Sequence, residues 1–249
     1  MTIDSDKDLL GLQEIGRIVA TILKQMMAYA EPGMTTLELD MYGKSLFEKF
    51  GANSAPLLTY NFPGYTCISI NEEAAHGIPG ERVIQAGDMV NIDVSGELNG
   101  YFADTGGSFV MPPSEPLKTR LCHATRMALE SACQAARAGQ PINVIGKAIE
   151  KVAKQNRFKI IKNLCSHGVG RSLHEEPKEI PGYFDRRDLR ILQEGQVITI
   201  EPFLSTKSSL VKEQADGWTL SGCKNNLSAQ YEHSMVITKG KPILLTVAD

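Results

Sequence analysis

Residues 87–94, "GDMVNIDV", and residues 195–202, "GQVITIEP", share one pattern: a glycine, a β-branched residue three positions later, an isoleucine, and then an acid. The β-branched residues predict a strand in each segment. Asp93 and Glu201 occupy the same place in the two patterns, although acidic residues are almost never buried without a partner. The repeat therefore predicts two related strands whose carboxylates need an explanation.

The helices that precede these strands also repeat. Apolar residues at helical spacing predict a helix over residues 7–30. A possible capping box at Thr35 and Glu38 begins a second helix that runs to about Phe50. A further pair of helices is predicted within 117–156.

Each half of the chain thus has two helices followed by acid-bearing strands. We interpret this repeat as a gene duplication that gives an α+β protein with two facing lobes, which share one sheet and one core. Chance similarity between short β segments is the alternative. The predicted unit is a single catalytic domain of residues 1–249, with internal halves at about 7–112 and 113–247.

Strand periodicity separates apolar from polar positions, because successive side chains point to opposite faces. Val90 and Ile92 point to one face of the first strand, and Asp93 points to the other. Ile200 and Glu201 are separated in the same way. We therefore expect the helices to cover the apolar face and the acids to converge on the opposite, concave face.

Two more acids accompany β-rich segments: Asp104 precedes "TGGSFVM", and Glu232 lies in "AQYEHSMVIT". Four carboxylates in one cleft repel each other and stay ionised only beside a positive charge. Lysine and arginine residues nearby do not alternate onto that face. A pair of divalent metal ions, about 3.5–4 Å apart, is the natural counter-charge.

Three histidines lie in glycine-containing loops: His76 in "EEAAHGIPG", and His167 and His174 in "SHGVGRSLHEEP". One nitrogen ligand from His167 beside four carboxylates favours Mn²⁺, Fe²⁺ or Co²⁺ over a thiolate zinc site. His76 and His174 are each followed by a proline three residues later. This repeat predicts that both contact the substrate.

The composition argues against several other classes of protein. The formal net charge is −3 and no run of lysine or arginine stands out, so nothing indicates a nucleic-acid-binding surface. No run of about 18 apolar residues offers a membrane span, and the N-terminal residues lack the pattern of a signal peptide. We therefore expect a cytoplasmic protein. Five scattered cysteines without a CxxC motif predict free thiols instead of disulfides or structural zinc.

Six fragments in order resemble type I methionine aminopeptidases: "CISINEEAAHGIPG", "VNIDV", "ADTGGSF", "SHGVGRSLHEEP", "TIEPF" and "SAQYEHSMVIT". The short distance from Glu201 to Glu232 leaves no room for the helical insertion of type II enzymes. The resemblance implies the pita-bread fold, in which two pseudo-symmetric halves surround one curved antiparallel sheet. It also implies metal-dependent removal of N-terminal methionine from nascent proteins and peptides, with a preference for a small second residue.

The resemblance implies a role for each site residue. The metal ligands are Asp93, Asp104, His167, Glu201 and Glu232, with Asp104 and Glu232 bridging two divalent ions (Co²⁺, Mn²⁺, Fe²⁺ or Zn²⁺). A hydroxide that bridges the ions attacks the first peptide bond. His76 contacts the scissile amide, His174 holds the developing oxyanion, and Glu201 passes a proton to the leaving amine. Asn71 and Ser228 resemble positions near a monovalent-cation site.

The expected methionine pocket is lined by Phe62, Cys67 and Trp218. The chain departs from the family in two places. Leu173 stands where the family usually has an aromatic residue before His174, and the pocket loop "APLLTYNFPG" has Pro56 and Thr59 where relatives often have cysteine and tyrosine. These departures concern the selectivity of the pocket and leave the reaction unchanged.

Two other functions fit parts of the pattern. A prolidase-like or Xaa-Pro peptidase would use the same metal ligands, although such enzymes usually carry a large additional N-terminal domain. A non-catalytic pita-bread binding protein would have lost ligands, whereas all five ligands and both histidines are present here. The expected partners are the N-termini of nascent polypeptides, at the ribosome, and we expect a monomer without direct contact to nucleic acid or membrane.

Overall fold

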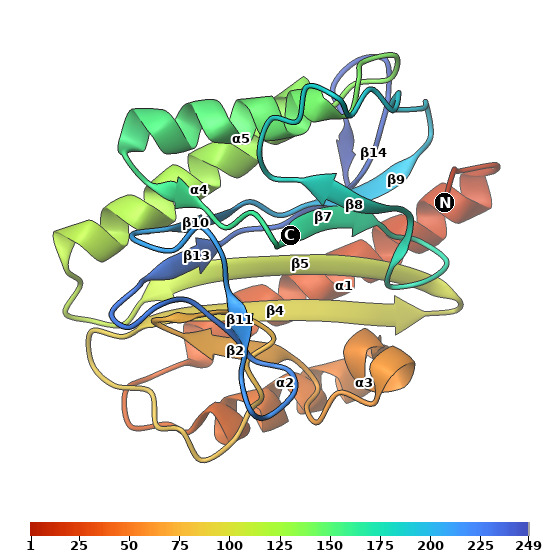
Figure 1. Ribbon diagram of the computed structural model, residues 1–249. Coiled ribbons are helices and arrows are strands. Elements are labelled where there is room, and N and C mark those ends of the chain that lie inside the picture. The colour runs from red at the N-terminus through yellow and green to blue at the C-terminus, as the bar shows by residue number, and fades with distance from the viewer. Residues whose placement is uncertain (249) are drawn as a thin grey trace.

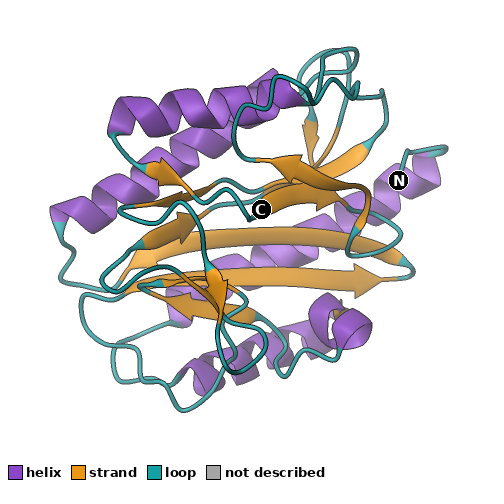
Figure 2. Ribbon diagram, viewed as in Figure 1, coloured by secondary structure: helices purple, strands orange, loops and turns teal. Residues whose placement is uncertain are grey.

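The computed structural model describes residues 1–248, and its helices lie outside a central set of strands (Figure 1). Figure 2 shows the same view with helices and strands in separate colours. The helices are α1 Asp6–Tyr29, α2 Thr36–Phe50, α3 Ala55–Tyr60, α4 Pro116–Ala135 and α5 Asn143–Asn156. The strands are β1 Asn53–Ser54, β2 Cys67–Ile70, β3 Glu73–Ala75, β4 Met89–Leu98, β5 Tyr101–Val110, β6 Lys159–Ile160, β7 Cys165–Gly168, β8 Glu175–Pro181, β9 Val197–Ile200, β10 Phe203–Ser205, β11 Lys212–Glu213, β12 Leu220–Ser221, β13 Ser228–Gln230, β14 His233–Val236 and β15 Ile243–Leu244.

Four of these helices correspond to the two predicted helix pairs, which are confirmed. α1 buries Leu12, Ile15 and Val19 completely, as their helical spacing predicts. The capping box is present at the start of α2. Thr35 Oγ1 accepts a hydrogen bond from the Glu38 backbone N–H (3.1 Å), and Glu38 Oε2 accepts one from the Thr35 N–H (2.7 Å).

The segment "APLLTYNFPG" differs from the expected loop, because residues 55–60 form the short helix α3. Ser54 Oγ caps this helix by accepting a hydrogen bond from the Leu57 N–H (3.4 Å). Pro56 lies in the first turn, where its missing N–H has no intrahelical partner to lose. These local signals are sufficient for one turn and a half of helix, which sets the position of Tyr60.

The strand pairs of the described residues are antiparallel, as predicted, and form four hydrogen-bonded sheets. In the first, β4 pairs with β1, β2 and β5; the second has the order β15-β14-β9-β7-β8; the two smaller sheets are β13-β10-β6 and β11-β12-β3. The β4–β5 hairpin turns at Asn99 and Gly100, whose φ angles of 53° and 79° are typical of an Asn-Gly turn. The expected α+β architecture is confirmed.

Hydrogen bonds between β5 and the segment 231–234 join the two larger sheets. The Asp104 N–H donates to Ser234 Oγ (2.9 Å), and the Ser234 hydroxyl donates to the Asp104 carbonyl (2.8 Å). Thr105 Oγ1 donates to the Glu232 carbonyl (2.8 Å). Side-chain hydroxyl groups thus replace part of the backbone hydrogen bonding between β5 and residues 232–234. The two larger sheets are therefore not continuous where the two acid-bearing segments meet.

The buried apolar residues form two large clusters, one for each pair of long helices. Val90 and Ile92 of β4 pack in the cluster that contains α1, and Ile198 and Ile200 of β9 pack in the cluster that contains α4 and α5. The predicted apolar faces of both strands are therefore confirmed, whereas the duplicated halves stay a prediction. In Figure 1, α1 runs behind β4 and β5, while α4 and α5 lie above them.

The five cysteines are free thiols, as predicted. Among residues 1–248, the helices lack the combination of length and apolar character that a membrane crossing needs.

Candidate metal centre and substrate pocket

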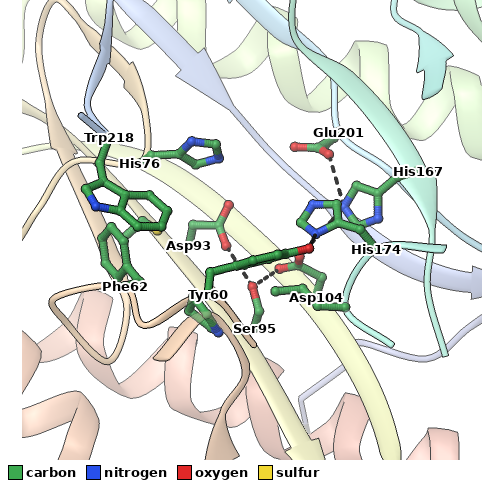
Figure 3. Close-up of a pocket in the computed structure, with 13 residues that line it drawn as sticks. Tyr60, Phe62, His76, Asp93, Ser95, Asp104, His167, His174, Glu201 and Trp218 are labelled. Carbon is green, nitrogen blue, oxygen red and sulfur yellow. Dashed lines mark hydrogen bonds and ion pairs between the residues drawn. The ribbon is translucent and has the colours of Figure 1, made fainter. Parts of the chain in front are cut away.

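Most of the predicted site residues line one cavity of about 380 Å³ (Figure 3). These residues are Phe62, Cys67, His76, Asp93, Asp104, His167, Leu173, His174, Glu201 and Trp218. In Figure 3 Asp104, His167, His174 and Glu201 lie on one side of Tyr60, Phe62 and Trp218 lie on the other with His76 beside Trp218, and Asp93 lies between the two groups. The cavity therefore has a charged wall and an apolar wall.

The β4–β5 hairpin places two acids in this cavity. Asp93 lies on β4, and Asp104 lies on β5 directly opposite Ser95 of β4. The Ser95 hydroxyl lies 2.6 Å from Asp104 Oδ1 and 3.4 Å from Asp93 Oδ1, and it donates to these carboxylates. The hairpin register therefore fixes both carboxylates side by side.

Glu232 joins Asp104 and His167 from the C-terminal half of the chain. One ligand atom from each of these three buried residues lies within 4.8 Å of the other two. His167 Nε2 is 3.9 Å from Asp104 Oδ2 and 3.6 Å from Glu201 Oε1. Glu232, which precedes β14, and Glu201, which follows β9, thus lie near the acids of the β4–β5 hairpin.

The orientation of the His167 ring suits a metal ligand. Nδ1 lies 2.9 Å from the Gly168 carbonyl oxygen, which can only accept a hydrogen bond, so Nδ1 carries the proton. Burial lowers the pKa of His167 to about 4, and the ring is neutral at pH 7. The unprotonated Nε2 then faces carboxylate oxygens, an arrangement that is repulsive unless a cation lies between them.

Two further observations on the carboxylates fit a bound cation. Glu232 Oε1 is a buried oxygen without a hydrogen-bond partner among the described residues. Burial, together with the neighbouring negative charges, raises the pKa values of Asp93, Glu201 and Glu232 well above the usual range. A divalent cation would supply the missing partner and the missing charge, so the residues present fit a metal site.

Gln230 holds two of these carboxylates in place. Its Nε2 donates to Asp93 Oδ2 (3.3 Å) and to Glu232 Oε2 (3.1 Å). The side chain passes over Gly106, where an added Cβ would lie only 2.3 Å from Gln230 Oε1. Gly106 therefore leaves the space through which Gln230 reaches the cluster.

His76 and His174 lie at the cavity without direct contact to most of the carboxylates, and both reach solvent. The His174 ring packs against His167, with 4.1 Å between ring centroids. Burial lowers the pKa of both histidines, to about 4 for His174, where His167 adds to the effect. Both rings are thus neutral at pH 7, and a neutral ring can donate one hydrogen bond.

The apolar wall is built around Phe62, which is 1% exposed. The Phe62 and Trp218 rings meet edge to face, with 5.2 Å between centroids. The Cys67 thiol is buried beside them, and burial raises its pKa well above the usual range, so it is an apolar group here. Pro56 and Leu173 also line the cavity, whereas Thr59 is exposed outside it.

The predicted monovalent-cation residues make hydrogen bonds within the protein. Asn71 Nδ2 donates to Asp88 Oδ1 (2.7 Å), and Ser228 Oγ accepts from Asn226 Nδ2 (2.9 Å). The Ser228 N–H donates to the Asn71 carbonyl (3.2 Å), so the two residues are neighbours. A monovalent cation at this place stays a prediction.

Three residues of the site were not predicted from the sequence: Ser95, Gln230 and Tyr60. Ser95 and Gln230 each lie two positions from an acid, so strand periodicity places them on the same face as Asp93 and Glu232. The alternation of side chains along the strands could therefore have identified both residues. Tyr60 gave no comparable signal, because its place depends on α3.

The model of "Metallopeptidase family M24" matches residues 11–239 of the chain. The chain belongs to this family. A methionine aminopeptidase of Staphylococcus epidermidis is 49% identical over 100% of both chains, and methionine aminopeptidase 2 of Bacillus subtilis is 46% identical over 99% of both. The crystal structure of a methionine aminopeptidase from Thermotoga maritima superposes with a TM-score of 0.94 at 28% identity and covers 99% of both chains. These matches confirm the resemblance to type I methionine aminopeptidases and the pita-bread fold.

Proposed function

We propose that this chain removes the N-terminal methionine from polypeptides whose second residue is small. The observation that carries this proposal is the cluster of Asp104, His167 and Glu232, whose ligand atoms lie within 4.8 Å of each other beside a cavity with an apolar wall. The full-length relatives that are named methionine aminopeptidases support it.

Divalent metal would be held by Asp93, Asp104, His167, Glu201 and Glu232. Divalent ions in an oxygen-rich set lower the pKa of bound water to near neutrality and polarise a scissile carbonyl. Ser95 and Gln230 orient the carboxylates through the hydrogen bonds described above. The donor set suits Mn²⁺, Fe²⁺ or Co²⁺, and Zn²⁺ also binds such ligands.

The two walls of the cavity select the substrate. The carboxylates attract the free α-amine of a polypeptide, which confines the reaction to the first residue. Phe62, Cys67 and Trp218 form the apolar wall against which the first side chain packs, and the thioether of methionine suits irregular apolar space. The preference for a small second residue is what the resemblance to type I methionine aminopeptidases implies.

His76, His174 and Glu201 act on the peptide bond. The neutral ring of His76 donates to the scissile amide, and that of His174 donates to the carbonyl oxygen as its negative charge develops. Glu201 passes a proton to the leaving amine. The enzyme acts on nascent polypeptides in the cytoplasm, as a monomer.

A panel of peptides tests the proposed function. Metal-loaded enzyme is given Met-Ala-Ser, Met-Lys-Ser, Leu-Ala-Ser and Gly-Pro, and the released amino acid is measured. We expect rapid release of methionine from Met-Ala-Ser, slower release of leucine, and little cleavage of Met-Lys-Ser or Gly-Pro. Selectivity for Gly-Pro would instead support an Xaa-Pro peptidase, and no release from any peptide by metal-loaded protein would support a binding protein.

A further inference from the structure

Tyr60 reaches from the C-terminal end of α3 to His174, and its hydroxyl lies 2.8 Å from His174 Nδ1. In Figure 3 the Tyr60 ring crosses the front of the cavity, and its oxygen points at the imidazole. The two rings are tilted by 50° with 5.6 Å between centroids. The residue is 43% exposed, so the hydroxyl reaches the site from its rim and not from the core.

The backbone of α3 fixes the position of Tyr60. The Ser54 cap begins the helix, and Asn61 ends it in a left-handed conformation with φ 54°. The Asn61 N–H donates to the Leu57 carbonyl (3.1 Å), which closes the last turn around Tyr60. The Tyr60–His174 contact therefore links the end of α3 to the loop between β7 and β8.

The chemistry of the two groups sets the direction of this hydrogen bond. A phenol is a good donor and a weak acceptor, while the unprotonated nitrogen of a neutral imidazole is a good acceptor. The Tyr60 hydroxyl keeps its proton at pH 7, because a tyrosine phenol ionises only at about pH 10. The better match is thus a hydrogen bond donated by the Tyr60 hydroxyl to His174 Nδ1, which leaves the His174 proton on Nε2.

We propose that Tyr60 is a positioning residue that holds His174 in the tautomer with its proton on Nε2, ready to donate to the oxyanion. This inference rests on the role of His174 in the proposed function. His167, whose ring packs against His174, has the opposite tautomer because its Nδ1–H donates a hydrogen bond to the Gly168 carbonyl oxygen. One histidine therefore offers a lone pair to a cation, and its neighbour offers a proton to the substrate.

The tautomer can be measured without a substrate. Nitrogen-15 NMR of the enzyme loaded with diamagnetic Zn²⁺ reports which imidazole nitrogen is protonated, and the His174→Ala spectrum identifies the signals among five histidines. We expect His174 to carry its proton on Nε2 in the wild type and to show a mixture of tautomers in Tyr60→Phe. A proton on Nδ1 in the wild type, or an unchanged tautomer in Tyr60→Phe, would overturn the proposal.

Kinetics test the consequence for the reaction. Tyr60→Phe keeps the ring and removes one hydrogen bond, so we expect kcat on Met-Ala-Ser to fall about three- to tenfold while KM changes little. In the His174→Ala background the same substitution should have no further effect. An equal loss in both backgrounds would show that Tyr60 acts on structure and not through His174.

Tyr29→Phe is the matched control, because Tyr29 is an exposed tyrosine on α1, away from the cavity. It should leave kcat, KM and the His174 signals unchanged. The NMR experiment tests the role of Tyr60, and the peptide panel tests the proposed function, so either hypothesis can be refuted without the other. A protein with the expected tautomer that cleaves no Met-Ala-Ser refutes the proposed function, and an active enzyme with the wrong tautomer refutes only the role of Tyr60.

Discussion

Replacing Glu232 by glutamine should have opposite effects on the stability of the metal-free and the metal-loaded protein. Glu232 is 1% exposed, and its Oε1 has no hydrogen-bond partner among the described residues. An unsatisfied buried polar group costs about 1–3 kcal/mol. Glutamine has the same shape, carries no charge, and can donate a hydrogen bond towards Asp104. We therefore expect Glu232→Gln to stabilise the metal-free protein.

For a protein of this size, each kcal/mol corresponds to a change in Tm of about 2–4 °C. The metal-free variant should thus melt about 2–12 °C above the metal-free wild type. Added Mn²⁺ or Co²⁺ should stabilise the wild type by about 2.7 kcal/mol at a hundredfold excess over Kd, and thereby raise its Tm. The same addition should raise the Tm of Glu232→Gln much less, because one shared ligand is lost.

The pH dependence provides a second measurement of the same effect. The folded protein raises the pKa of Glu232 above its value in the unfolded chain. The destabilising penalty is therefore absent below the unfolded pKa and increases as the pH rises towards the folded pKa. The advantage of metal-free Glu232→Gln should be larger at pH 8 than at pH 5.

Calorimetry of chelator-treated and metal-loaded samples measures these Tm values, and elemental analysis measures the metal content of each sample. Glu213→Gln is the matched control, since Glu213 is an exposed glutamate on β11 and should show none of these effects. A metal-free Glu232→Gln protein that is no more stable than the wild type, together with an unchanged response to metal, would refute the cation site at Glu232.

Three further predictions concern the site and the fold. His76→Ala and His174→Ala should each keep their metal by elemental analysis and lose about 10²–10³ in kcat, because each removes one positioned donor; loss of metal would make these residues ligands. Leu173→Phe should raise the preference for methionine over leucine in competition assays, because it adds an aromatic ring to the cavity. An unchanged ratio of methionine to leucine release would show that Leu173 does not contribute to the selectivity of the cavity. Thr35→Ala should lower the Tm by about 2–4 °C through loss of the α2 cap, while Thr35→Ser should not; equal melting of both variants would contradict the capping role.

Much of the local structure followed from the sequence because the signals lie within a few residues of each other. The capping box joins Thr35 to Glu38, and strand alternation separates Ile92 from Asp93. Both are confirmed, since capping hydrogen bonds and the pleat of a strand depend on neighbours in the chain. The identity of the acids and histidines in the cavity followed from the same repeat and from the family resemblance.

The meeting of the two halves was decided by tertiary structure alone. Asp104 and Glu232 lie side by side because the hydroxyls of Thr105 and Ser234 connect β5 to a segment more than a hundred residues away in the chain. The contact of Tyr60 with His174 likewise spans 114 positions. The sequence determined which side chains of the strands face the cavity, because alternation is a property of each strand by itself. Only the packed structure decided which of them touch, because the hydrogen bonds of Asp104 with Ser234 and of Tyr60 with His174 join segments that approach one another only when the whole core is assembled.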